Sequence, residues 1–186
     1  MKILVVGGTQ DFGKGVTEYL GQDAFGIGRS NGFDVCDRSV FKKIVEMSRE
    51  YQAVVVVTNA NNLQPELVEK IAIDWLERNH DGYLFCLGST AVYHEKYDRD
   101  RRVWNYLRSK EGLKLLSKYI GEQVSNREVK MRFTNIQVGR LDNEKSRSKP
   151  GFRVGLKPEE VGSVVRFLLD TPKHLCVHEV YMDPKY

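Results

Sequence analysis

The stretch Lys2-Ile-Leu-Val-Val-Gly-Gly-Thr-Gln-Asp-Phe-Gly13 decides the fold of this 186-residue chain. Its apolar run over residues 2–6 predicts a buried strand, and a helix is expected over 13–20, so the glycines lie in the turn between them. A glycine-rich turn lets the backbone approach a pyrophosphate, whose charge is stabilised by the N–H groups and the dipole at the helix start. The stretch therefore predicts a dinucleotide site. The alternative is a tight turn that binds no ligand.

Strand-like and helical runs alternate along the rest of the chain. Strands are expected at 24–28, 53–58, 83–88, 130–137 and 176–182, with a short piece near 33–35, and helices at 39–50, 65–79, 104–124 and 158–169. Such alternation implies right-handed β-α-β crossovers. We expect an α/β fold, a Rossmann-like, doubly wound parallel sheet with helices on both faces, which is a three-layer αβα sandwich. Residues 1–186 are expected to form a single dinucleotide-binding domain.

A second pattern, Tyr106-Leu-Arg-Ser-Lys110, lies on the helix expected at 104–124. Residues four apart share one face of a helix, so the phenol and the ammonium can point into the same site. An adjacent cation favours the phenolate, which brings the pKa of a tyrosine, about 10 when free, closer to neutrality. Ser89, at the end of the strand 83–88, could hold a carbonyl oxygen beside them. Ser89, Tyr106 and Lys110 are thus candidates for proton-transfer chemistry; the alternative is a solvated helix face and a serine bonded to its own backbone.

Taken in order, Gly7-xxx-Asp11-x-Gly13, Thr58-Asn-Ala-Asn61, Ser89 and Tyr106-xxx-Lys110 resemble the successive motifs of the short-chain dehydrogenases/reductases. Residues 131–143 and 157–161 are similar to the family's sixth strand with its following turn and to the start of its last helix. The resemblance spans essentially the whole chain. It implies hydride transfer between a nicotinamide cofactor and a carbonyl or alcohol carbon of a small substrate, with Ser89, Tyr106 and Lys110 as the catalytic residues.

The resemblance also implies where the cofactor binds. Arg29 and Ser30 end the second strand, where an acidic residue would bind the ribose of NAD and a cation would accept the extra phosphate of NADP, so NADP(H) is expected. A solvated strand end is the alternative for Arg29. Asp34 and Val35 would contact the adenine edge. The expected cofactor contacts are Gly7, Thr9, Gln10, Phe12, Gly13, Arg29, Ser30, Asp34, Val35, Asn59, Ala60, Tyr106, Lys110, Gly139 and Leu141.

The chain departs from the family pattern at several positions. Asp11 stands for the middle glycine of the turn, where its carboxylate would lie near the phosphate or cap the following helix. Asn61 stands where the family has glycine, and Val138 replaces the proline before Gly139. The segment 64–78 contains no Asn for the family's fourth catalytic position, so no proton relay through it is expected.

The composition of the chain indicates which partners and which cellular location to expect. A net charge of +4 and a pI near 8.9 are spread along the chain without basic clusters, so nucleic acid is not expected as a partner. Three separated cysteines, and the lack of a signal-peptide pattern or a long apolar run, lead us to expect reduced thiols, no membrane contact and a cytoplasmic location. The histidines show no ligand spacing, so no metal is assigned.

The sequence allows more than one oligomeric state and more than one function. Related enzymes pair the helix corresponding to 104–124 with its copy, so its apolar residues predict either a homodimer or packing on the chain's own sheet: Leu107, Leu113, Leu116 and Ile120. For function, the alternatives are a catalytically silent NADP-binding regulatory protein and an NADP-dependent epimerase or dehydratase of nucleotide sugars.

Overall fold

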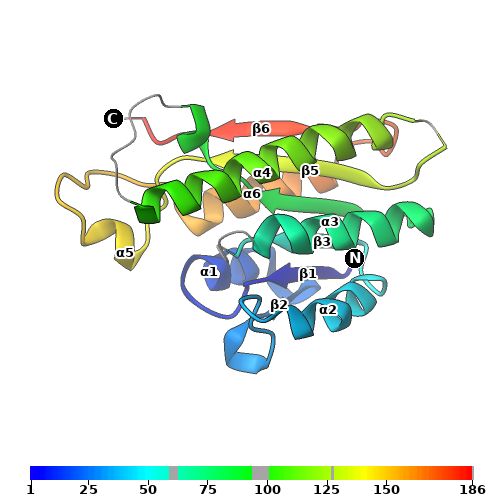
Figure 1. The fold of residues 1–186 in the computed structure, drawn as a ribbon, viewed down its shortest axis with the longest axis horizontal. Helices are drawn as coiled ribbons and strands as arrows, with labels where there is room; N and C mark the ends of the chain where they lie inside the picture. The colour runs from blue at the N-terminus through cyan, green and yellow to red at the C-terminus, as the bar shows by residue number, and fades with distance from the viewer. Residues whose placement is uncertain (59–62, 94–100, 127, 186) are drawn as a thin grey trace.

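The computed structural model describes residues 1–58, 63–93, 101–126 and 128–185, with the backbone alone for 101–103. Its centre is a parallel sheet with the strand order β2-β1-β3-β4-β5-β6 (Figure 1). The strands are β1 Ile3–Val6, β2 Ala24–Ile27, β3 Ala53–Val56, β4 Tyr83–Leu87, β5 Arg132–Val138 and β6 Glu179–Met182. Because β2 and β3 flank β1 on opposite sides, the chain winds outward in both directions from β1.

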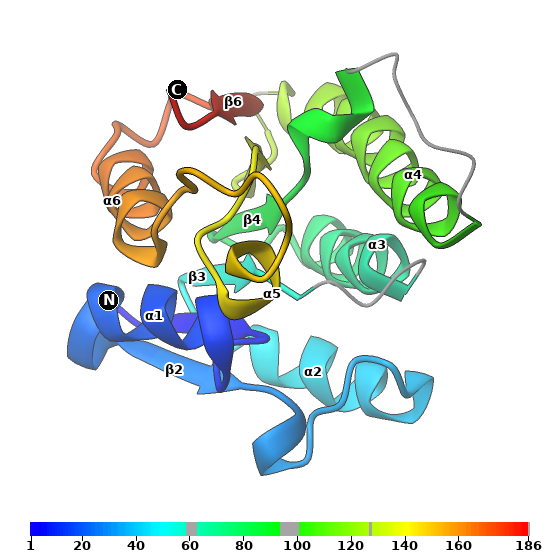
Figure 2. The ribbon, with the colours of Figure 1, turned by 90° about the vertical axis from the view of Figure 1, so that its left-hand side faces the viewer.

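Helices cover both faces of the sheet, as Figure 2 shows. The helices α1 Asp11–Leu20 and α6 Pro158–Leu169 lie on one face, and α2 Phe41–Ser48, α3 Leu63–Glu77 and α4 Arg101–Val124 lie on the other. The predicted Rossmann-like, doubly wound sheet in a three-layer sandwich is therefore confirmed. No helix within the described ranges is both long and apolar enough to cross a membrane.

Alternation along the strands divides the core into two clusters. Val54 and Val56 of β3 point toward α2, α3 and α4, whereas Ala53 and Val55 point toward α1 and α6. All four residues are fully buried, as expected for a central parallel strand covered on both sides. Burial of both sheet faces explains why the central strands read as continuous apolar runs.

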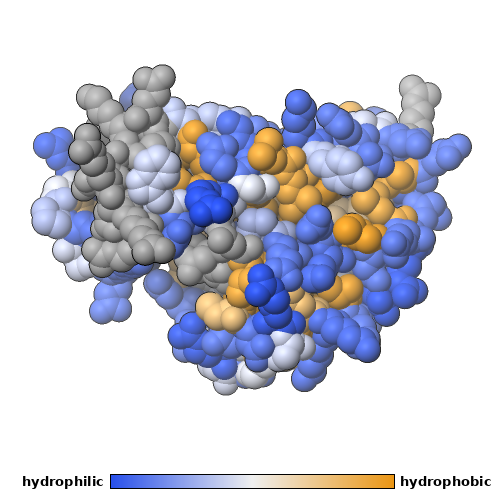
Figure 3. Space-filling view, in the orientation of Figure 1, coloured by the Kyte–Doolittle hydropathy of each residue, from blue (hydrophilic) through white to orange (hydrophobic). Residues whose placement is uncertain are grey.

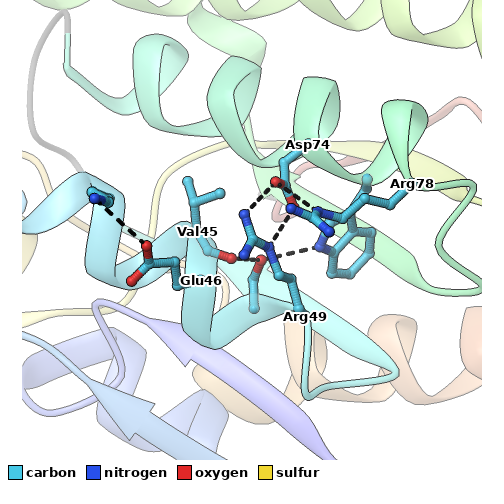
Figure 4. A network of polar contacts seen from close by, with 8 residues as sticks. Val45, Glu46, Arg49, Asp74 and Arg78 are labelled. Carbon is cyan, nitrogen blue, oxygen red and sulfur yellow. Dashed lines mark hydrogen bonds and ion pairs between the residues drawn. The ribbon is translucent and has the colours of Figure 1, made fainter.

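A polar network fixes α2 against α3 (Figure 4). Arg49, just after α2, forms two hydrogen bonds to the Asp74 carboxylate, at 2.6 and 3.0 Å. Arg78 donates to Asp74 at 3.1 Å, and the Trp75 indole donates to the Ser48 hydroxyl at 3.0 Å. The hydrogen bond from Arg49 contributes most to holding the pKa of Asp74 below its ordinary value. This network holds α2 and α3 together on one face of the sheet.

The predicted strand piece near 33–35 is wrong. The Phe33 N–H donates to the Gly28 carbonyl at 2.9 Å, and the Asp37 N–H donates to the Asp34 carbonyl at 2.8 Å, so turn bonds replace a strand ladder. The described sheet therefore ends at β2. Four short 3-10 segments and one short helix were also not predicted: η1 Gly21–Asp23, η2 Arg29–Asn31, η3 Arg38–Val40, η4 Thr90–Tyr93 and α5 Glu144–Arg147.

Candidate active site

The glycine-rich turn lies at the carboxyl ends of β1 and β3, where the strand order reverses. Gly7 has a φ of +88°, and an added Cβ there would lie 3.0 Å from the Thr58 nitrogen. An added Cβ on Gly13 would lie only 2.1 Å from the Gly7 carbonyl oxygen. Two side-chain-free positions thus bring the start of α1 directly against the strand ends. This is the crevice in which open α/β sheets bind their ligands.

The start of α1 differs from the expectation for Asp11. The helix begins at Asp11 itself, its N-cap is Gln10, and no side chain caps it, so the predicted cap by Asp11 is wrong. Asp11 instead has a φ of +46°, a left-handed conformation that glycine adopts more readily. The first turn therefore has no side-chain cap competing with an anion for its N–H groups. The geometry of this turn fits a pyrophosphate.

The neighbouring cofactor candidates differ in how their side chains lie. Phe12 packs its ring in the core, so its backbone is the part that can face a ligand. Thr9 lies against β2, since an added Cβ on Gly28 would lie 2.4 Å from its hydroxyl. Gln10 is exposed beside the turn.

At the end of β2, Arg29 and Asp34 pair with each other. The Arg29 Nε donates to Asp34 Oδ2 at 3.1 Å, and both side chains are well exposed, so the pair is weak. A hydrogen bond from the Cys36 N–H is the main effect that holds the pKa of Asp34 below its ordinary value, and the positive charge of Arg29 lowers this pKa further. Ser30 is exposed beside Arg29, whereas Val35 is buried in the core. The guanidinium remains exposed at the surface beside the end of β2.

Tyr106 and Lys110 share one face of α4, as predicted. The Lys110 ammonium lies 5.8 Å from the centroid of the Tyr106 ring. It also donates to the Leu87 carbonyl at 2.9 Å, two residues before Ser89 at the end of β4. The structure therefore brings α4 and the Ser89 turn together at the same edge of the sheet.

Gln64, which our sequence reasoning did not single out, holds Lys110 in place. The Gln64 Oε1 accepts from the Lys110 ammonium at 2.7 Å, and its Nε2 donates to the Leu87 carbonyl at 3.0 Å. Both side chains are buried, and burial lowers the pKa of Lys110 to about 8. Gln64 thus supplies a direct contact to Lys110 in a segment that offers no Asn.

This burial predicts a pH-dependent cost in stability. Because the folded pKa of Lys110 lies below the ordinary 10.5, the unfolded chain binds the proton more tightly. The cost is fully present below pH 8, and it is relieved between about pH 8 and 10.5, where the free energy of unfolding rises with pH.

We expect Lys110→Met to lose this rise. In urea denaturation, the free energy of unfolding of the wild type should therefore increase relative to that of the variant from pH 7 to pH 10. Lys118→Met, at an exposed position of the same helix, is the control and should follow the wild type. Parallel pH curves for wild type and Lys110→Met would contradict the prediction.

Ser89 is buried, with only 4% of its surface exposed. Its hydroxyl oxygen accepts from the Ala91 N–H at 3.2 Å, and its own N–H donates to Gln137 Oε1 at 2.6 Å. The contact with Ala91 is the local backbone bond that the alternative reading expected. It uses the oxygen as an acceptor, so the hydroxyl proton can still be donated to a substrate oxygen.

The remaining cofactor candidates lie around the same edge or outside the described residues. Gly139 donates its N–H to the Met182 carbonyl at 2.8 Å, and Leu141 forms an isolated bridge to Leu156. Beyond Leu141, Arg147 of α5 donates to Asp142 at 2.6 Å and closes that loop on itself. Asn59 and Ala60 lie outside the described residues.

The chain is similar to known proteins in its structure. No known family model matches the sequence, and no curated protein matches it. Among solved structures, a serine dehydrogenase in complex with NADP+ superposes with a TM-score of 0.73 and 18% identity, covering 98% of this chain and 94% of the other. A 3-alpha-hydroxysteroid dehydrogenase from Pseudomonas sp. B-0831 in complex with NADH gives 0.73 and 16%, covering 98% and 95%. A short-chain dehydrogenase/reductase from Vibrio parahaemolyticus gives 0.72 and 11%, covering 99% and 100%. At these identities, the likeness shows the fold.

Proposed function

We propose that this chain, which has the fold of the short-chain dehydrogenases/reductases, belongs to that family and is a nicotinamide-dependent oxidoreductase acting on a carbonyl or alcohol carbon of a small substrate. The observation that carries the proposal is the meeting of α4 with the end of β4. There the Lys110 ammonium lies 5.8 Å from the Tyr106 ring centroid and 2.9 Å from the Leu87 carbonyl oxygen. The glycine-rich turn opens onto the same edge of the sheet.

We assign a chemical role to each residue of the proposed site. A bound nicotinamide supplies or accepts the hydride. Tyr106 donates a proton to the substrate oxygen during reduction, and the Ser89 hydroxyl orients that oxygen by a hydrogen bond. Lys110 stabilises the phenolate that forms when Tyr106 has donated its proton, and Gln64 keeps the ammonium in place.

The proposed cofactor is NADP(H), bound with its pyrophosphate at the turn from Gly7 to Gly13. Support comes from the close backbone approach at Gly7 and Gly13, the uncapped start of α1 and the exposed Arg29. Against it stands the Asp34 carboxylate, which pairs with Arg29 and would have to give way to the phosphate.

Arg29→Ala tests the choice of cofactor. A charge-assisted hydrogen bond contributes about 1.5–3 kcal/mol, so affinity for NADPH should fall about tenfold or more, whereas affinity for NADH should stay within about twofold. Fluorescence titration of both cofactors measures this difference. Arg38→Ala is the matched control, because Arg38 is equally exposed and pairs with Glu66 instead. Equal losses for NADPH and NADH would remove Arg29 from the phosphate site.

Turnover of a panel of carbonyl compounds with NADPH and NADH tests the activity itself. The proposal expects oxidation of the cofactor with at least one class of carbonyl substrate. Tight cofactor binding without any turnover would favour a regulatory protein instead. Conversion of a nucleotide sugar without net consumption of cofactor would favour an epimerase or dehydratase.

The four apolar residues predicted on α4 fit packing on the chain's own sheet, the second of the two alternatives, and Leu116 is partly buried against the same core. Leu107, Leu113 and Ile120 are buried in the chain's own core, so they do not offer a surface to a second copy. The exposed side of α4 carries Trp104, Leu115 and Tyr119 instead, and Figure 3 shows apolar side chains on the face formed by α3 and α4. If the protein is a homodimer, we propose that this exposed side forms the interface.

We infer that residues 1–186 work as one dinucleotide-binding domain. The three cysteines, Cys36, Cys86 and Cys176, form no disulfide among the described residues, which fits a reducing compartment such as the cytoplasm.

A further inference from the structure

A chain of side-chain hydrogen bonds runs from Ser89 to the edge of the sheet. The Ser89 N–H donates to Gln137 Oε1 at 2.6 Å, and Gln137 Nε2 donates to Glu179 Oε1 at 2.7 Å. Gln137 is fully buried in β5, whereas Glu179 begins the edge strand β6 and lines a cavity of about 470 Å³ between α4 and β6. One buried amide therefore connects an acidic side chain near the surface to the candidate catalytic serine.

Glu179 determines which way the Gln137 amide points. A carboxylate only accepts hydrogen bonds, so the amide nitrogen faces Glu179 and the amide oxygen faces the Ser89 N–H. The reversed amide would set two donors together at Ser89 and two acceptors together at Glu179. Because this contact is buried, the penalty for reversal is larger than it would be in water.

Gln137 in turn lies tightly against the peptide that carries Ser89. An added Cβ on Gly88 would lie 2.2 Å from Gln137 Oε1, so there is no free space between the amide and this turn. A shift of Gln137 would therefore move the backbone on which the Ser89 hydroxyl depends.

Glu179 also holds the far end of the turn that follows Ser89. The Tyr93 hydroxyl, at the end of η4, donates to Glu179 Oε1 at 3.3 Å, and the Tyr181 hydroxyl donates to Oε2 at 2.6 Å. Burial is the largest of the effects that raise the pKa of Tyr93, so this phenol keeps its proton and remains a donor. Both ends of the segment from Ser89 to Tyr93 are thus tied to one carboxylate.

We propose that Glu179 is a positioning residue that acts through Gln137 to hold Ser89 in the orientation needed to bind the substrate oxygen. The catalytic part of this inference rests on the proposed function, whereas the control of the Ser89 turn does not.

Amide hydrogen exchange at Ser89 tests the control of the turn without any turnover. In Glu179→Leu, the Ser89 N–H should exchange about tenfold faster or more, because its acceptor is no longer held in one orientation. Glu179→Gln keeps an acceptor oxygen for Gln137 and should restore most of the protection. Glu122→Leu, at an exposed glutamate that lines the same cavity, is the matched control and should leave the exchange at Ser89 unchanged. Unchanged exchange in Glu179→Leu would overturn the inference.

Steady-state kinetics tests the catalytic part. Glu179→Leu should lower kcat about ten- to hundredfold with little change in cofactor affinity. In a Ser89→Ala background, the same substitution should cost less than about twofold, because its effect passes through Ser89. Equal losses in both backgrounds would show a general structural effect and overturn the positioning role. A wild type without turnover would refute the proposed function and with it the catalytic part, while the exchange measurement would still decide whether Glu179 controls the turn.

Discussion

Replacing Tyr106 by Phe is expected to lower kcat about 10²–10⁴-fold while leaving cofactor affinity within about twofold. The substitution removes the one hydroxyl proposed to protonate the substrate oxygen and keeps the aromatic ring on α4. The Lys110 ammonium retains its bonds to Gln64 and to the Leu87 carbonyl, so the local structure should persist. Steady-state turnover and a fluorescence titration with NADPH, made on the same preparation, measure both effects.

Tyr119→Phe is the matched control for this substitution. Tyr119 lies on the same helix and is 58% exposed, so loss of its hydroxyl should leave kcat unchanged. A Tyr106→Phe variant that keeps wild-type turnover would remove Tyr106 from the proton-transfer role.

The second large effect is expected for Gly13→Ala, which tests the turn between β1 and α1. Even a methyl group there would lie 2.1 Å from the Gly7 carbonyl oxygen and 2.8 Å from a Val57 methyl carbon. The start of α1 must then move away from the strand ends. We expect a loss of about 1–3 kcal/mol in the free energy of unfolding, as for other overpacked sites. NADPH affinity should fall about tenfold or more with it, because the N–H groups at the helix start move away from the pyrophosphate position.

Gly112→Ala provides the comparison for Gly13→Ala. An added Cβ on Gly112 would meet only ordinary contact, with its nearest neighbour, a Pro65 carbon, at 3.9 Å. In the middle of α4, this change should stabilise the protein by about 0.5–1 kcal/mol. Urea denaturation and NADPH titration of the two variants measure the contrast. A Gly13→Ala variant as stable and as tightly binding as the wild type would mean that the turn does not form the described contact.

The sequence predicted features that depend on local patterns. The run from Lys2 to Gly13 gave both the first strand and the turn, because apolar periodicity and glycine are local signals. The spacing of Tyr106 and Lys110 placed them on one helix face. Alternation of strands and helices was enough to predict the parallel sheet and its two helical layers.

The sequence did not predict contacts between distant segments. Gln64 and Lys110 are separated by 46 positions, and Gln137 and Glu179 by 42, so nothing in the local pattern links them. Such buried polar side chains become recognisable only once the strands that bring them together are known. The wrong strand near 33–35 has the opposite cause, because the local turn bonds of Phe33 and Asp37 prevailed over its strand-like pattern.

The most direct test of the account is a crystal structure of the protein with NADP+ bound. We expect the pyrophosphate at the turn from Gly7 to Gly13, the 2′-phosphate beside Arg29, and the nicotinamide at the edge where Ser89, Tyr106 and Lys110 meet. A cofactor bound elsewhere, or a nicotinamide directed away from Tyr106, would contradict it.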